Sequence, residues 1–283
     1  MERESCLAML IALFGGIAIF ACGWWHRGPA GPGSARSMER LCWRRLWLPL
    51  APAVIVAAWL CGWALVEPDP VPEKVPSAIL IASLPFILLF ARTAIRAGWS
   101  LLRDDGDPGT ATVGLLKPWI LFSPHLARTL DQAEIDAALE HERAHARHRD
   151  PLRIWLAQLA TDLQWPWPQA QERFRHWLVA LELARDEEAR IAGIEGADLA
   201  AAIMAVARLR QPPIVSPLAA LIGEQSVLKE RIACLLEPRR DEAEASEVKA
   251  WLPWTLVPGL LIAVVLGSIF GETIVRTLLR LAV

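Results

Sequence analysis

The chain has 283 residues, of which 54% are hydrophobic and 21% charged, and its formal net charge is −2. This apolar balance argues against a single soluble core and favours segments that span a membrane. The near-neutral charge gives no sign of a nucleic-acid partner, and five scattered cysteines without a Cys-x-x-Cys pair argue against a disulfide framework.

Three apolar stretches in residues 1–103 are each long enough to cross a bilayer as a helix. The first is interpreted as a retained span and not as a signal peptide, because the preceding MERES is not net positive and no A-x-A site follows. Pro85 is expected to kink the third span. The predicted spans cover about residues 6–25, 46–66 and 78–97.

The charges of the connecting loops predict an orientation. Residues 26–45 hold five arginines against one glutamate, whereas residues 67–77 hold three acids against one lysine. Arg92, Arg96 and Arg103 lie at the end of the third span. Because cytoplasmic loops are enriched in Lys and Arg, the N-terminus is expected outside and residues 98–250 in the cytoplasm. This is the arrangement of a multi-pass protein of a bacterial-type inner membrane.

Residues 104–237 are expected to form a cytoplasmic domain. It begins with two short β segments, Thr110–Leu116 and Trp119–Ser123, which are followed by helices. A charged linker at 238–250 then leads into a fourth span at about 251–271, within the C-terminal segment 251–283, where a GxxxG pair is a candidate helix-packing face. The predicted helices cover about 131–150, 151–163, 169–192, 198–210 and 224–237.

The helix predicted over 131–150 carries the chemistry. Asp131 followed by Glu134 has the form of a capping box, and the pair Asp150-Pro151 is expected to supply the N-cap and first residue of the next helix. Within it, residues 141–145 read HERAH, an HExxH pattern.

Residues four apart on a helix share a face, so the imidazoles of His141 and His145 can hold one metal ion. Glu142 then lies beside the ion, where its carboxylate can take a proton from a water molecule. This is the zinc-peptidase arrangement, and Zn²⁺ is the expected cofactor. A catalytic zinc needs a third protein ligand, for which Glu182 is the best candidate; the alternative makes Glu182 and Asp186 part of a solvated stripe.

A resemblance to a known family supports the first interpretation. The segment LKPWILFSPHLARTLDQAEIDAALEHERAHARHRDPLR resembles the core of membrane zinc metallopeptidases of the BlaR/MecR type, the antibiotic-sensing receptor proteases. WLVALELARDEEA resembles the downstream E-L-x-x-D helix of that family, and LKERIACLLEP (228–238) resembles its conserved tail. The resemblance implies that Glu182 is the third zinc ligand and that Asp186 contacts the ligands without binding the metal itself. It also implies a mainly α fold: a multi-span helical membrane protein with a cytoplasmic zincin-like metallopeptidase domain that contains a small β element.

The chain also departs from the antibiotic sensors of this family. They carry a large extracellular penicillin-binding domain after the fourth span, where this sequence has about a dozen residues, so we expect no such sensor domain here. Of the other polar residues, His148 is expected to face solvent, and Asp150 is a second candidate acceptor for a histidine N–H. His176 and Arg185 are candidates for stabilising an oxyanion.

These features predict an integral-membrane zinc-dependent endopeptidase that cleaves cytosolic or membrane proteins. The resemblance implies cleavage of a transcriptional repressor in signal transduction, and the strand at 119–123 is expected to hold substrate extended. One alternative is a membrane quality-control protease of the HtpX/Ste24 kind. Another is a non-proteolytic membrane sensor or scaffold that uses the zinc fold to bind a partner, although such a site has no need of the Glu142 carboxylate.

Overall fold

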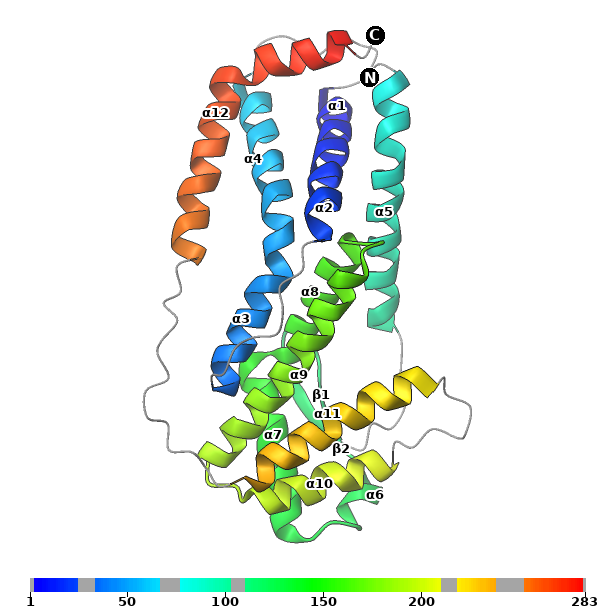
Figure 1. The fold of residues 1–283 in the computed structure, drawn as a ribbon, viewed down its shortest axis with the longest axis vertical. Coiled ribbons are helices and arrows are strands. Elements are labelled where there is room, and N and C mark those ends of the chain that lie inside the picture. The colour runs from blue at the N-terminus through cyan, green and yellow to red at the C-terminus, as the bar shows by residue number, and fades with distance from the viewer. Residues whose placement is uncertain are drawn as a thin grey trace.

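The structure, a computed structural model, describes residues 3–24, 34–66, 77–102, 110–209, 218–237 and 252–281. Figure 1 shows α1, α2, α4, α5 and α12 standing side by side, with the remaining helices and both strands gathered at one end of them. The described chain begins and ends at the opposite end of this bundle (Figure 1). Most of the two predicted N-terminal loops, with Arg27 and the acidic segment, Arg103, and the linker 238–250 lie outside the described residues.

Within the described ranges, four helical segments are long and apolar enough to cross a membrane, as the hydropathy predicts. The second begins earlier than expected because the arginine-rich stretch before residue 46 is also helical, and the fourth continues past residue 271.

The predicted mainly α fold is confirmed. The elements are α1 (Arg3–Leu10), a π-helical turn (Ile11–Gly15), α2 (Gly16–Gly23), α3 (Ala35–Trp47), a 3₁₀ turn (Leu48–Leu50), α4 (Ala51–Val66), α5 (Ser77–Leu102) and α12 (Leu252–Leu281).

Helices α4 and α12 pack against each other through glycines. A Cβ atom added to Gly267 would lie 1.9 Å from the carbonyl oxygen of Trp59, and one added to Gly62 would lie 2.1 Å from that of Val264. Gly271 packs in the same way on the Trp63 side chain. The GxxxG pair is therefore part of a close helix-packing face within the chain.

The described residues of the domain at the end of the bundle are helical apart from one two-stranded sheet. Strands β1 (Thr110–Val113) and β2 (Trp119–Phe122) are antiparallel and shorter than predicted, since the chain turns at Gly114, which has φ +91°. The capping box forms as predicted, with Asp131 accepting from the N–H of Glu134 at 2.9 Å. The helices are α6 (Pro124–Ala127), which was not predicted, α7 (Gln132–His148), α8 (Asp150–Leu163), α9 (Pro168–Ile191), α10 (Gly196–Leu209) and α11 (Leu218–Leu236).

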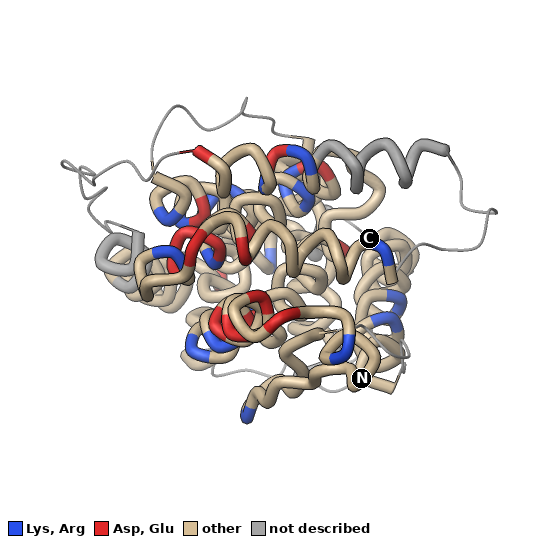
Figure 2. Tube along the Cα trace, turned by 90° about the horizontal axis from the view of Figure 1, so that it is seen from below, with Lys and Arg blue, Asp and Glu red and all other residues tan. Residues whose placement is uncertain are grey.

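The domain and the membrane helices are packed into one body. Arg173 of α9 donates to the carbonyl oxygen of Gly23 at the end of α2 (3.1 Å), and Arg96 of α5 pairs with Asp162 of α8 (3.1 Å). One hydrophobic cluster joins buried residues of α2, α3, α4, α8 and α9. Figure 2, seen from the domain end, shows acidic and basic residues interleaved over the elements at this end, which favours pairing of charges between them.

Candidate metal centre

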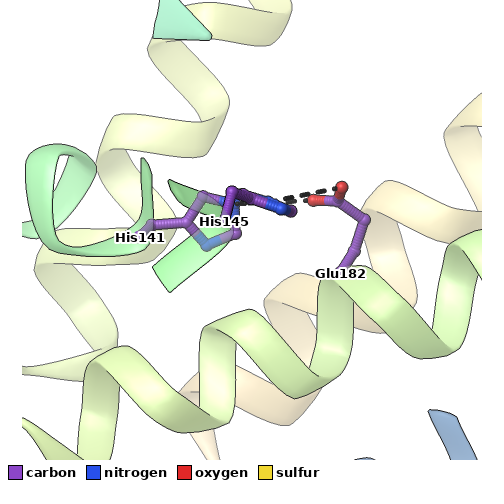
Figure 3. Close-up of side chains that lie close together, drawn as sticks. All are labelled: His141, His145 and Glu182. Carbon is purple, nitrogen blue, oxygen red and sulfur yellow. Dashed lines mark hydrogen bonds and ion pairs between the residues drawn. The ribbon is translucent and has the colours of Figure 1, made fainter. Parts of the chain in front are cut away.

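Three polar side chains from α7 and α9 converge at one point (Figure 3). The Nε2 atoms of His141 and His145 lie 3.0 Å apart, and the Glu182 carboxylate oxygens lie 3.5 Å from the first and 3.7 Å from the second. A tetrahedral zinc ion with bonds of about 2.0–2.1 Å holds its ligand atoms about 3.3 Å apart. The three separations bracket this value, so the donor set and its spacing fit a zinc ion.

Each imidazole has a carboxylate behind it. Nδ1 of His145 lies 2.9 Å from Oδ2 of Asp150 in a buried hydrogen bond. Nδ1 of His141 lies 3.0 Å from Oδ1 of Asp186, although in a geometry too oblique for a regular hydrogen bond. A carboxylate at Nδ1 favours the proton there and leaves Nε2 free to bind a metal, which is the usual support of histidine ligands.

The expectation that Asp150 caps α8 is wrong. The residue that joins the two helices is Arg149, which is left-handed (φ +52°) and makes no side-chain cap, and Asp150 is already the first residue of α8. Its carboxylate is fully buried and binds His145 and the guanidinium of Arg185, at 2.6 Å. Burial alone would raise the pKa of Asp150, but its hydrogen bonds with His145 and Arg185 lower it to about 2, so the carboxylate is ionised at neutral pH.

Arg231 of α11 completes the far side of the site, and sequence reasoning missed it. Its guanidinium binds both Asp186 oxygens at 2.8 Å and one oxygen of Glu182 at 2.8 Å. Burial alone would raise the pKa of Glu182, but Arg231 and the histidines hold it well below its usual range. The one available signal was the resemblance of residues 228–238 to the family's tail, which includes this arginine but does not assign it a partner.

The carboxylate of Glu142 is held by a threonine that sequence reasoning also missed. Oγ1 of Thr112, on β1, lies 2.8 Å from Oε2 of Glu142 and 2.8 Å from its backbone oxygen. Glu142 is buried beside His141 on α7. The strand therefore fixes the glutamate that the HExxH pattern assigns as the base.

The remaining candidates lie away from the three ligand atoms. His148 is half exposed and pairs with Glu188, as expected for a solvent-facing residue. His176 is exposed on α9 and points about 240° around the helix from Glu182. Arg185 is buried against Asp150, so it supports His145 and is not placed to stabilise an oxyanion.

A comparison with protein families assigns the domain. Residues 108–235 match the family model described as BlaR1 peptidase M56. The matched segment contains the three ligand candidates as well as Glu142, and it extends through the segment that carries Arg231. No curated protein and no solved structure matches the chain.

Proposed function

The chain carries a peptidase domain of the BlaR1 M56 family over residues 108–235, and on this premise we propose that it is an integral-membrane zinc-dependent endopeptidase. The observation that carries the proposal is the convergence of His141, His145 and Glu182 at zinc-ligand spacing. These three residues would hold the ion. Bound there, zinc would supply a Lewis acid that polarises the attacking water and the scissile carbonyl.

The chain itself supplies the proton transfers. Glu142 would accept a proton as the water oxygen attacks the carbonyl carbon, and it would deliver that proton to the leaving amine as the C–N bond breaks. Thr112 keeps the Glu142 carboxylate at one position, because its hydroxyl lies within hydrogen-bond distance of both the side chain and the backbone oxygen of the same residue. Arg231 keeps the acids of the site ionised.

Replacing Thr112 with valine removes this hydroxyl at nearly constant volume. A hydrogen bond to a charged group contributes about 1.5–3 kcal/mol, so we expect kcat to fall by roughly 10- to 100-fold while zinc content is unchanged. Steady-state hydrolysis of a quenched peptide, together with metal analysis, measures both. Thr129→Val is the control. The Thr129 hydroxyl donates to the Leu126 carbonyl three residues earlier (2.8 Å), so this substitution should leave kcat unchanged. An unaltered kcat in Thr112→Val would remove this residue from the base's support.

The arrangement of the spans supports a cytoplasmic site. The described termini lie at the end of the bundle opposite the domain (Figure 1). The arginine-bearing helix α3 and the arginine-rich end of α5 lie at the domain's end, which the positive-inside rule places in the cytoplasm. The substrates would then be cytosolic proteins or membrane proteins of a bacterial-type inner membrane, and a transcriptional repressor is the case that the family resemblance suggests.

Comparing the membrane and cytosolic proteomes of cells that express the wild-type chain or Glu142→Ala tests this function. The proposal expects full-length substrate to accumulate, and its fragments to disappear, in the variant. A single accumulating regulator would favour signalling, whereas a broad set of damaged membrane proteins would favour the quality-control alternative. Identical proteomes, with both chains expressed and membrane-inserted, would support the non-proteolytic scaffold.

A further inference from the structure

A partly buried ion pair links the metal centre to α3, the helix that leads into the candidate span α4. Glu39 lies on α3, which continues through a 3₁₀ turn into the candidate span α4, and its side chain is 9% exposed. Its carboxylate contacts the guanidinium of Arg153 on α8 and accepts a hydrogen bond from the indole N–H of Trp177 (3.4 Å). A carboxylate from the helix that precedes the candidate span is thus held against the domain.

Arg153 connects Glu39 to the metal centre. One of its terminal nitrogens binds Glu39, and the other donates to Oδ1 of Asp150 at 2.9 Å. The guanidinium carbon also lies over the rings of Trp43 and Trp177, at 4.9 and 5.7 Å from their centroids, in two cation–π contacts. Contacts with two rings limit the orientations open to the guanidinium, so its two terminal nitrogens stay divided between the two carboxylates.

Asp150 connects Arg153 to His145, one of the proposed metal ligands. Its Oδ2 accepts from Nδ1 of His145 at 2.9 Å and from Arg185, while Oδ1 is shared by Arg185 and Arg153. Two arginines therefore face one fully buried acid, and Glu39 supplies the second negative charge that Arg153 requires. Without Glu39, Arg153 would be drawn more strongly onto Asp150, in competition with the imidazole of His145.

We propose that Glu39 and Arg153 are positioning residues of the metal centre, which set the orientation of His145 through Asp150. Metal affinity then depends on whether α3, and with it the membrane helix α4, is docked on the domain. The inference rests on the proposed metal centre but not on the identity of the substrate. It connects the helix that leads into the candidate span α4 to a metal ligand through two intervening residues, Arg153 and Asp150.

The test is a zinc titration of the full chain in detergent micelles, in competition with a chromophoric chelator. We expect Glu39→Gln to raise the Kd for zinc by roughly 3- to 10-fold, which is less than the 10- to 100-fold typical for loss of a residue in direct contact with a ligand. The visible absorption spectrum of bound Co²⁺ should also shift, because the ring of His145 changes orientation. A purely structural role for Glu39 would lower thermal stability without moving either quantity.

Glu187→Gln is the matched control. Glu187 also joins α9 to α3, by accepting from the backbone N–H of Arg36 at 3.3 Å, and this contact involves neither Glu39 nor Arg153 nor Asp150. Its Kd and Co²⁺ spectrum should match those of the wild type. A wild-type Kd and spectrum in folded Glu39→Gln would overturn the inference.

If Glu39→Gln does not fold, the zinc Kd of Arg153→Lys tests the inference instead. This variant keeps the positive charge but loses the planar fork that bridges the two carboxylates, so the Kd should still rise; an unchanged Kd would overturn the inference. Failure of the wild-type chain to bind zinc at all would instead overturn the proposed function.

Discussion

Replacing Glu142 with alanine should lower the rate of peptide hydrolysis by roughly 10²- to 10⁴-fold, the range that general acid–base catalysis contributes. Zinc content should remain about one ion per chain, since the converging ligand atoms belong to His141, His145 and Glu182 and not to Glu142. The local fold should also survive, because Thr112 can still donate to the backbone oxygen at position 142. A variant that loses turnover but retains the metal would identify Glu142 as the base and not as a metal ligand.

The comparison requires single-turnover kinetics and metal analysis on the same preparations. Glu140→Ala is the matched control: Glu140 lies two residues earlier on α7 and pairs at the surface with Arg143 and Arg147. Exposed pairs of this kind contribute about 0–1 kcal/mol to stability, so hydrolysis should be unchanged. Wild-type turnover in metal-loaded Glu142→Ala would show that another group accepts the proton.

Replacing Glu182 with alanine should instead remove the metal. It takes away one of three protein donors and leaves Arg231, whose guanidinium binds Glu182 and Asp186 at 2.8 Å, with one carboxylate in place of two beside the site. The loss of zinc affinity should exceed the roughly 10- to 100-fold seen when a residue that hydrogen-bonds to a metal ligand is removed. Hydrolysis should fall in step with metal occupancy.

Equilibrium dialysis against buffered zinc measures this affinity. Glu172→Ala, at an exposed position near the start of the same helix, controls for the loss of a glutamate from α9. An affinity in Glu182→Ala equal to that of the wild type would exclude Glu182 from the ligand set and would point to a different third donor.

The part of the site that the sequence predicts is the part set by local geometry. His141, Glu142 and His145 lie on one helical turn, so their relative positions follow from the helix period once the helix is recognised. Glu182 lies on another helix, and the resemblance was needed to assign it. The four membrane helices follow from hydropathy in the same local way, and only their ends differ from the prediction.

The residues that were missed come from packing between distant segments. Thr112 reaches Glu142 from a strand, Arg231 reaches Glu182 from α11, and Glu39 reaches Arg153 from α3. No spacing rule relates such pairs, since their contacts depend on how the helices dock. Asp150 was misassigned because Asp-Pro is typical of a helix start, whereas the left-handed Arg149 frees its carboxylate for His145.

X-ray absorption at the zinc edge of the purified full-length chain tests the metal centre most directly. We expect about one zinc per chain, coordinated by two imidazole nitrogens and by oxygen atoms at about 2.0–2.1 Å, with this signal lost in Glu182→Ala. Substoichiometric zinc in the folded protein, or sulfur ligands at about 2.3 Å, would contradict it.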